Sequence, residues 1–218
     1  MGQLQEKIAI VTGAAKGLGA AVAELFVREG ASVVMTDVDA ASGERAAAAL
    51  GGAARFQDHD VRRETDWERV IGATVAEFGR LDILVNNAGV IEIGSIETQT
   101  LEQWRLVSSV IAEGAFLGCK HAVLAMKKSG GGTIVNVASI ASLQGEPYVV
   151  AYCAAKGAVE SLTRSVAVHC AQMRYNLRCN SIHPAKIDTP LMAEIPRKFT
   201  EAVRQGMRLP AGLAAVNS

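Results

Sequence analysis

Short hydrophobic runs rich in valine and isoleucine alternate along the chain with longer segments in which hydrophobic residues recur at helical spacing. The short runs predict strands and the longer segments predict helices. Strands are expected at 7–11, 32–36, 55–58, 81–85, 133–138 and 177–182, and helices at 17–29, 39–50, 65–79, 100–128 and 149–173. This alternation predicts an α/β fold of the Rossmann type, in which a doubly wound parallel sheet lies between two layers of helices.

Polar residues mark the starts of three of these helices. Asp39 is placed to cap the second helix, because its side chain can accept a hydrogen bond from a free backbone amide of the first turn. Thr65 with Glu68, and Thr100 with Gln103, match the capping box, in which two side chains satisfy two such amides reciprocally. We therefore expect helices to begin at these three places.

Composition and charge narrow the class of protein. The chain has 218 residues, half of them hydrophobic, with 22 basic and 22 acidic side chains. This length suits one domain over 1–218, and the balanced charge argues against nucleic-acid binding and against a polybasic membrane surface. The first residues carry charges where a signal peptide is apolar, and the four cysteines show neither metal-ligand spacing nor disulfide density. The prediction is a cytoplasmic protein with reduced thiols.

A glycine-rich turn follows the first expected strand and opens the next helix, at residues 12–19. Glycines let a backbone turn tightly against a pyrophosphate, and the N-terminus of a helix offers free N–H groups to phosphates. A simple tight turn is the alternative, but the position after the first strand favours a dinucleotide site. The expected cofactor contacts here are Gly13, Ala15, Lys16, Gly17, Leu18 and Gly19.

Asp37 and Val38 follow the second expected strand. A carboxylate at this place accepts hydrogen bonds from the adenosine ribose and repels a 2′-phosphate, so Asp37 favours NAD over NADP. Lys16 is a counter-argument, since a basic residue in the glycine-rich turn can attract that phosphate. We give Asp37 more weight than Lys16, with an ordinary turn residue as the alternative reading of Asp37.

Polar residues also follow the third and fourth expected strands. The carboxyl ends of strands are where open α/β sheets bind ligands. Ordinary loop chemistry is the alternative, because Asn and Gly are common in turns. The residues expected to line the cofactor site here are Asp60, Val61, Asn87, Ala88 and Gly89.

A candidate catalytic set lies further along the chain. Ser139 ends the fifth expected strand, and Tyr152 and Lys156 stand four residues apart in a helix, which places them on one face. A free tyrosine has a pKa of about 10. A nearby ammonium and a positive nicotinamide ring favour the phenolate, which lowers the pKa and makes the phenol a general base. A tyrosine–lysine pair on a helix is more often an ordinary surface feature.

The glycine-rich turn, the Asn-Asn-Ala-Gly run, Ser139 and Tyr152-x-x-x-Lys156, in this order and spacing, resemble the short-chain dehydrogenase/reductase family over roughly 7–192. The resemblance implies NAD(P)-dependent interconversion of alcohols and ketones. It implies that Tyr152 takes the hydroxyl proton, Ser139 holds the substrate oxygen, and Lys156 binds the nicotinamide ribose and tunes Tyr152. It also places Pro184, Ile187 and Thr189 beside the nicotinamide.

Within this family, the residues around Ser139, Tyr152 and Pro184 look most like bacterial cyclic-alcohol and hydroxysteroid dehydrogenases. Two neighbouring classes are disfavoured. Sugar-nucleotide epimerases need a longer substrate domain, and enoyl reductases space their tyrosine and lysine differently. The resemblance also implies that helices 100–128 and 149–173 pair in a homodimer, often within a homotetramer.

Three departures from the family pattern stand out. Ile111 replaces an asparagine that in the family supports a helix distortion and an ordered water in a proton relay, so we expect slow or pH-shifted turnover. Ala185 replaces a glycine after Pro184 and is followed by Lys186. Residues 185–210 supply a substrate-covering segment, but the rest is too short for the family's last helix and strand, which predicts an exposed edge at strand 177–182. Three explanations of such an edge stay open: another chain covers it, the stability is marginal, or the sequence is incomplete.

Other candidate residues receive plainer readings. The histidines His59, His121, His169 and His183 lack spaced partners, so no metal site is expected. Cys153 adjoins Tyr152 but faces another side of the helix. Candidates for an apolar substrate pocket, with ordinary core packing equally open, are Ile91, Ile93, Leu143, Val149, Leu191, Met192 and Phe199.

The leading hypothesis is an NAD-dependent oxidoreductase acting on an apolar, cyclic or steroid-like secondary alcohol. The alternative is a catalytically impaired NAD-binding protein that acts through binding or assembly.

Overall fold

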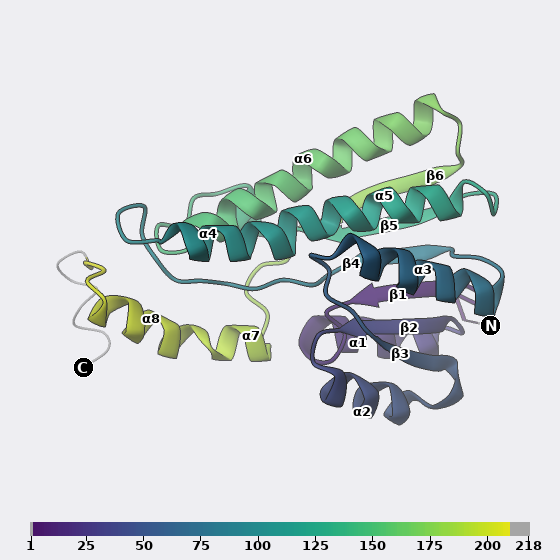
Figure 1. Ribbon diagram of the computed structural model, residues 1–218, viewed down its shortest axis with the longest axis horizontal. Coiled ribbons are helices and arrows are strands. Elements are labelled where there is room, and N and C mark those ends of the chain that lie inside the picture. The colour runs from purple at the N-terminus through teal and green to yellow at the C-terminus, as the bar shows by residue number, and fades with distance from the viewer. Residues whose placement is uncertain (1, 210–218) are drawn as a thin grey trace.

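The computed structural model describes residues 2–209 and contains one parallel six-stranded sheet with the order β3-β2-β1-β4-β5-β6 (Figure 1). The chain moves outward from β1 to β3, then crosses back to β4 on the other side of β1. This reversal creates a switch point between β1 and β4, where such sheets bind ligands. The strands are β1 (Ile8–Thr12), β2 (Ser32–Asp37), β3 (Ala54–Asp58), β4 (Ile83–Asn86), β5 (Gly132–Val137) and β6 (Leu177–Ile182).

Helices cover both faces of the sheet, which confirms the predicted three-layer Rossmann-type fold. One layer holds α1 (Gly17–Arg28) and α2 (Ala40–Leu50); the other holds α3 (Glu64–Phe78), α4 (Leu101–Ser108), α5 (Gly114–Met126) and α6 (Val150–Gln172). Two short helices, α7 (Pro190–Ala193) and α8 (Ile195–Arg204), lie beyond the carboxyl ends of the strands (Figure 1). They are therefore at the end of the sheet where a ligand site is expected.

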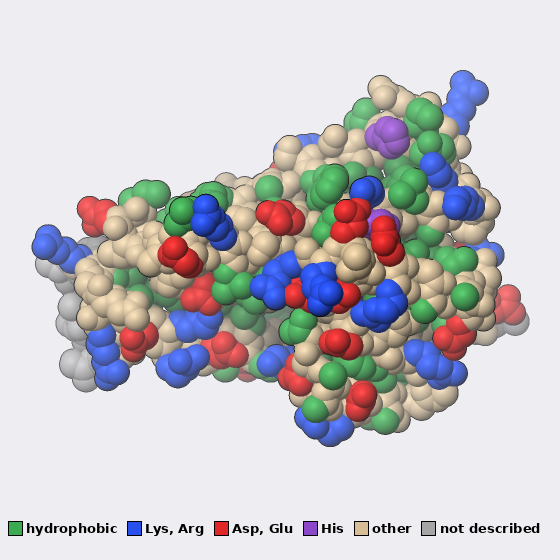
Figure 2. Space-filling view, viewed as in Figure 1, with side chains coloured by type: hydrophobic (Ala, Val, Ile, Leu, Met, Phe, Trp, Pro, Cys, Tyr) green, Lys and Arg blue, Asp and Glu red, His purple; other side chains and the backbone are tan. Residues whose placement is uncertain are grey.

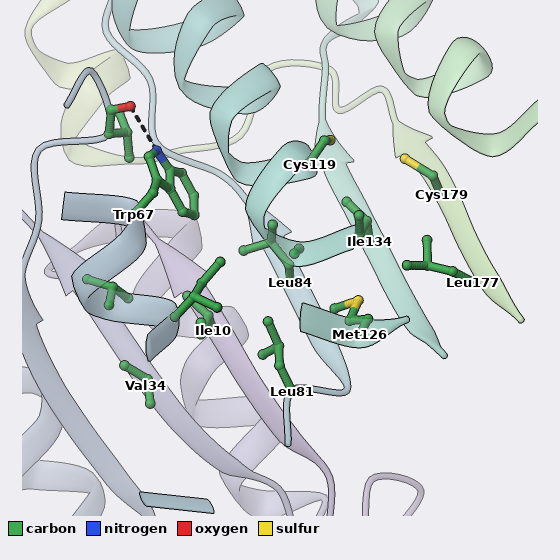
Figure 3. Packing of buried hydrophobic residues seen from close by; sticks show 14 of the residues in the cluster. Ile10, Val34, Trp67, Leu81, Leu84, Cys119, Met126, Ile134, Leu177 and Cys179 are labelled. Carbon is green, nitrogen blue, oxygen red and sulfur yellow. Dashed lines mark hydrogen bonds between the residues drawn. The ribbon is translucent and has the colours of Figure 1, made fainter. Parts of the chain in front are cut away.

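Two hydrophobic layers form because successive side chains of a strand point to opposite faces. On β1, Ile10 packs with Trp67, Leu84 and Met126 under α3 and α5, whereas Val11 packs on the α1 side. Figure 3 shows the first of these layers, where the Trp67 Nε1–H donates a 2.9 Å hydrogen bond to the Val61 carbonyl. The buried indole nitrogen is thus satisfied, and the loop that follows β3 is tied to α3.

The helix starts agree with two of three predictions. The Asp39 carboxylate accepts from the Ser42 amide at 3.1 Å, and Thr100 forms the predicted capping box with Gln103. The capping box at Thr65 is wrong, because α3 begins one residue earlier, at Glu64, and a residue already inside the helix cannot cap it. The acidic residues of this first turn instead favour the positive end of the helix dipole.

The long helix predicted over 100–128 is interrupted by one π-helical turn. This turn, η2 (Ser109–Glu113), separates α4 from α5 and has Ile111 at its centre. The whole run Leu101–Met126 has the length and composition of a membrane span, but it packs against β4, β5, α3 and α6. We therefore describe it as a core helix of this domain.

Among residues 2–209, β6 pairs with β5 alone, so its other edge has no strand partner there. Two further predictions concern the helix before β6 and the segment after it. The helix expected at 149–173 is α6, and the covering segment expected at 185–210 contains α7 and α8. Residues 210–218 lie outside the described residues.

Candidate active site

A pocket of about 520 Å³ opens at the carboxyl ends of the strands, between the sheet and the α7–α8 segment. It brings together predicted residues that are far apart in the sequence. Those lining it are Gly13, Lys16, Gly17, Leu18, Asp37, Val38, Asp60, Val61, Asn87, Ala88, Gly89, Ser139, Tyr152, Lys156, Pro184, Ile187 and Thr189. Ala15 and Gly19 are not among the lining residues: the Ala15 amide binds the Asp37 carboxylate, and Gly19 packs against the Gly13 carbonyl. This volume falls within the range of pockets that bind cofactors and other small molecules.

Two positions of the glycine-rich turn, Gly13 and Gly19, have no room for a side chain. Gly13 has a φ of +64°, and a Cβ there would lie 2.8 Å from the Ala88 Cα. A Cβ on Gly19 would lie 2.2 Å from the Gly13 carbonyl oxygen. Lys16 occupies the N-cap of α1 and makes no side-chain capping bond, so the first amides of the helix are free to bind an anion. This cradle fits the diphosphate of a dinucleotide.

Two backbone amides fix the Asp37 carboxylate at the end of β2. One oxygen accepts from the Ala15 amide at 3.1 Å and the other from the Asp39 amide at 3.0 Å. The pKa of Asp39 is lowered mainly by its hydrogen bonds with Ser42, and Lys16 contributes.

Arg62 is a pocket residue that the sequence reasoning missed. Its guanidinium grips the Asp60 carboxylate, with Nε 2.9 Å from one oxygen and Nη2 2.6 Å from the other. These hydrogen bonds from Arg62 hold the pKa of Asp60 below its usual value. The available signal was a basic residue two positions after Asp60.

His59 is also part of the pocket wall. Its Nδ1 lies 2.9 Å from the Thr36 hydroxyl, and its ring packs edge-on against Trp67. Burial lowers the pKa of His59 to about 4, so the ring is neutral at pH 7. Its role here is to support the wall between β2 and α3.

Asn87 acts on the glycine-rich turn through the backbone. Its amide side chain donates to the carbonyls of Thr12 at 2.8 Å and Gly13 at 3.1 Å. The Thr12 hydroxyl in turn accepts from the amides of Asn87 and Ala88, both at 3.0 Å. These hydrogen bonds join the end of β4 to the end of β1, and they account for an asparagine at position 87.

The candidate catalytic side chains meet at the floor of the pocket. Lys156 is buried and donates a 2.5 Å hydrogen bond from Nζ to the Val137 carbonyl, and its Nζ lies 5.5 Å from the centre of the Tyr152 ring. Burial lowers the pKa of Lys156 to about 8. Ser139 caps the short helix η3 (Ile140–Ser142) and is also buried.

The pKa of Tyr152 differs from the sequence-based expectation. Burial raises it above the usual value, and a hydrogen bond with Ser139 only partly offsets this effect. The neighbouring Lys156 does not reverse the shift in the protein alone, because desolvation of the phenolate outweighs the other contributions. Lowering this pKa would therefore require the positive nicotinamide ring as well.

Ile111 stands beside Lys156 at a small second cavity. This cavity, of about 10 Å³, is also lined by Asn86, whose Oδ1 is buried with no hydrogen-bond partner among residues 2–209. Such a volume holds about one water. Because η2 centres on Ile111, the helix distortion exists in this chain without an asparagine at that position.

The α7–α8 segment covers one side of the large pocket. Lys198 on α8 donates to the Ile91 carbonyl at 2.8 Å and to the Glu92 carboxylate at 2.6 Å. Of the apolar candidates, Ile91, Leu191 and Met192 line the pocket. Ile93, Val149 and Phe199 belong to a separate hydrophobic cluster that includes residues of α8, which is the packing alternative, and Leu143 is exposed.

Three other candidates lie outside the pocket lining. The Cys153 thiol faces the Glu146 carbonyl, as expected of a packing residue. Lys186 is exposed, whereas Ala185 reaches the pocket. His121 does have acidic neighbours, since its Nε2 lies 3.0 Å from the Glu64 carboxylate on another helix, a proximity that sequence spacing cannot reveal. Lys120 also binds that carboxylate, at 2.6 Å.

Acidic and basic side chains are mixed on the surface of the molecule. Figure 2 shows them intermingled over the face that is visible in that view. This agrees with the equal numbers of acidic and basic residues in the chain.

Comparison with known proteins agrees with this geometry. Residues 7–199 match the family model described as short chain dehydrogenase. A 3-beta-hydroxysteroid dehydrogenase of Comamonas testosteroni is 42% identical over 196 residues, covering 89% of this chain and 77% of that protein. An NADP-dependent (R)-specific alcohol dehydrogenase of Lentilactobacillus kefiri is 40% identical over 213 residues, covering 96% and 84%.

A solved structure, that of levodione reductase, superposes with a TM-score of 0.86 at 31% identity, covering 91% of this chain and 79% of that one. The family uses NAD(P), and the relatives act on alcohols or ketones. The chain belongs to the short-chain dehydrogenase/reductase family and is of the type that includes cyclic-alcohol and hydroxysteroid dehydrogenases.

Proposed function

We propose that this protein uses NAD to interconvert a secondary alcohol and a ketone on an apolar, cyclic or steroid-like substrate. The observation that carries the proposal is the convergence of Ser139, Tyr152 and Lys156 in the same pocket as the glycine-rich turn and Asp37. When bound, the nicotinamide cofactor supplies the acceptor or donor of hydride. Every other function needed for the reaction falls to side chains of this chain.

Tyr152 moves the proton in this proposal. Its phenol oxygen takes the proton of the substrate hydroxyl during oxidation and returns it during ketone reduction. The Ser139 hydroxyl holds the substrate oxygen beside the Tyr152 phenol. Lys156 binds the nicotinamide ribose and, with the bound nicotinamide, offsets the desolvation that raises the pKa of Tyr152.

The preference for NAD rests on Asp37. Its carboxylate is fixed by the amides of Ala15 and Asp39, so it cannot turn away from a 2′-phosphate without losing both hydrogen bonds. The proposed cofactor contacts are those predicted from the sequence: the glycine-rich turn, Asp37, Val38, Asp60, Val61, Asn87, Ala88, Gly89, Tyr152, Lys156, Pro184, Ile187 and Thr189. No metal takes part in the proposed reaction.

The substrate lies in this proposal between Tyr152 and the α7–α8 segment. We assign residues 1–218 to one domain in which 185–210 cover the substrate. The apolar surfaces of Ile91, Leu191 and Met192 in the pocket favour a hydrocarbon ring. The proposed setting is cytoplasmic. A homodimer or homotetramer is proposed because Phe116, Leu124 and Val168 expose apolar surface on α5 and α6.

A second candidate function is supported by Ile111. If the isoleucine blocks proton exchange at Lys156, the protein would bind NAD with little or no turnover and act through binding or assembly. The intact set of Ser139, Tyr152 and Lys156 favours the enzyme over this alternative.

One experiment separates the two functions. The purified protein is mixed with NAD or NADP and with cyclopentanol, cyclohexanol or a 3-hydroxysteroid, and reduced cofactor is followed by absorbance. Calorimetry measures NAD binding in parallel. Turnover with NAD supports the enzyme. NAD binding without turnover on any of these alcohols, or on the corresponding ketones with NADH, supports the second function.

A further inference from the structure

His183 and Ser142 form a polar contact around the backbone of Ser139 that the proposed chemistry does not use. The Ser142 hydroxyl donates a 2.7 Å hydrogen bond to the Ser139 carbonyl. His183 Nδ1 lies 2.9 Å from the same hydroxyl oxygen and 3.2 Å from the same carbonyl oxygen. Two polar side chains therefore converge on the carbonyl oxygen of the candidate catalytic serine.

The geometry determines which ring nitrogen of His183 carries a proton. A carbonyl oxygen only accepts, and the Ser142 hydroxyl has already given its proton to it. Nδ1 is then the donor and carries a hydrogen. This hydrogen is shared between the Ser142 hydroxyl oxygen and the Ser139 carbonyl oxygen. Nε2 lies 3.0 Å from the Ser181 hydroxyl, which can donate to it when the ring is neutral.

Backbone hydrogen bonds join the same two segments. The Ala138 amide donates to the Ile182 carbonyl at 2.9 Å, and the Ile140 amide donates to the Pro184 carbonyl at 3.1 Å. His183 thus stands between two backbone bonds that fasten the end of β5 to the turn after β6. The segment that holds Ser139 is supported on one side by this turn.

The α6 helix supports it on the other side. It contacts η3, the short helix Ile140–Ser142 that begins directly after Ser139. The same helix that presents Tyr152 therefore also contacts the loop that presents Ser139.

We propose that His183 and Ser142 are positioning residues. They hold the backbone of Ser139 so that the Ser139 hydroxyl stays beside the Tyr152 phenol. This inference rests on the proposed role of Ser139. A displacement of about 1 Å in such a group costs about 100-fold in rate, so a pair of hydrogen bonds that prevents it matters for turnover. If the Ser139 hydroxyl is displaced, its hydrogen bond to the substrate oxygen is weakened.

The test compares two replacements of His183. His183→Leu removes the donor at similar size, whereas His183→Asn keeps an N–H near the place of Nδ1. We expect His183→Leu and Ser142→Ala to lower kcat for cyclopentanol roughly 10- to 100-fold with NAD affinity unchanged, and His183→Asn to restore most of the loss. His169→Leu, on the exposed far end of α6, is the matched control and should leave kcat unchanged.

A double-mutant cycle shows whether the effect passes through Ser139. In a Ser139→Ala background, His183→Leu should lower kcat by less than about threefold, because the hydroxyl that it positions is gone. An equal loss in both backgrounds overturns the proposal. A loss of NAD affinity in His183→Leu also overturns it, because the histidine would then act on the Pro184 turn.

A readout without turnover separates this inference from the proposed function. Amide hydrogen exchange over 138–143 should speed up in His183→Leu and not in His183→Asn, measured on the cofactor-free protein. Unchanged exchange in His183→Leu overturns the positioning role even if the wild-type protein is active. Absence of wild-type turnover, with the expected exchange pattern, refutes the proposed function and leaves the hold on the Ser139 peptide established.

Discussion

The backbone amide of Ala15 donates a 3.1 Å hydrogen bond to the carboxylate of Asp37, which joins the glycine-rich turn to the end of β2. The contact fixes a negative charge at one end of the pocket. It also makes the turn and the carboxylate parts of one rigid feature, so that a bound dinucleotide meets both together.

Removing that charge should change the cofactor preference. Asp37→Asn keeps a hydrogen-bond acceptor for Ala15 but loses the charge. We expect the KM for NAD to rise about 10-fold, the size expected when a hydrogen bond to a charged group is weakened, and the KM for NADP to fall because repulsion of its phosphate is relieved. Steady-state kinetics with both cofactors measures the ratio. Asp58→Asn, outside the pocket lining, is the control; an unchanged ratio in Asp37→Asn would contradict the prediction.

Tyr152 is expected to carry the proton transfer. Tyr152→Phe keeps the ring and removes the hydroxyl, so kcat should fall about 100- to 10,000-fold, the range for loss of a general acid or base. NAD affinity should change little. Tyr175→Phe, which alters a tyrosine next to His169 at the far end of α6, should retain full activity. Activity of Tyr152→Phe within tenfold of the wild type would exclude the proposed role.

Lys156 should make the stability of the cofactor-free protein depend on pH. Its pKa is about 8 in the folded state against 10.5 for the free group, so the unfolded chain binds more protons between these values. Stability therefore rises with pH across this window. Below pH 8 the buried ammonium lowers the free energy of unfolding by its full desolvation cost, roughly 3 kcal/mol. Above pH 10.5 Lys156 is neutral in both states, and this cost is absent.

Denaturant unfolding from pH 7 to 10.5 measures this effect as a difference between variants. Lys156→Met removes the titrating group, so the wild type should gain stability relative to it as pH rises. Lys127→Met, which changes a lysine above the Tyr175 ring, provides the comparison without a buried charge. Parallel curves for wild type and Lys156→Met would show that Lys156 is not desolvated.

Ile111 is expected to slow turnover. Ile111→Asn places a polar amide beside the small cavity that Lys156 and Asn86 line, where it can hydrogen-bond a water. We expect kcat to rise and the pH optimum to broaden. Ile111→Val, which stays apolar, should not raise kcat. An unchanged rate in Ile111→Asn, with the protein folded by circular dichroism, would show that the isoleucine does not limit the reaction.

The sequence predicted the strands and helices well because their signals are local. β5 and β6 match their expected runs closely. β5 carries the apolar run typical of a buried parallel strand, whereas buried and exposed residues alternate over the first four positions of the edge strand β6. The capping box at Thr65 failed for a local reason as well. Choosing between helix starts one residue apart requires the backbone conformation of Arg63, and residue types alone do not provide it.

The candidate site was predictable as a set of residue types at recognisable spacing. The pKa shifts and ion pairs of the site could not be predicted in this way. The upward shift in the pKa of Tyr152 comes from burial, and Arg62 grips Asp60 because a turn folds the two side chains together. Likewise, the sequence left Phe199 open as a pocket residue or a packing residue. In the structure its ring packs edge-on against the Tyr148 ring.

The sequence by itself determined the family, the order of strands and helices, and the residues that the chemistry requires, because each depends on short motifs and on periodic burial. Only the tertiary structure decided how those residues act on one another. Desolvation, the hold of His183 and Ser142 on Ser139, and the one-water cavity behind Lys156 all depend on distances between segments far apart in the chain. Such distances are fixed by packing, which no local pattern of residues encodes.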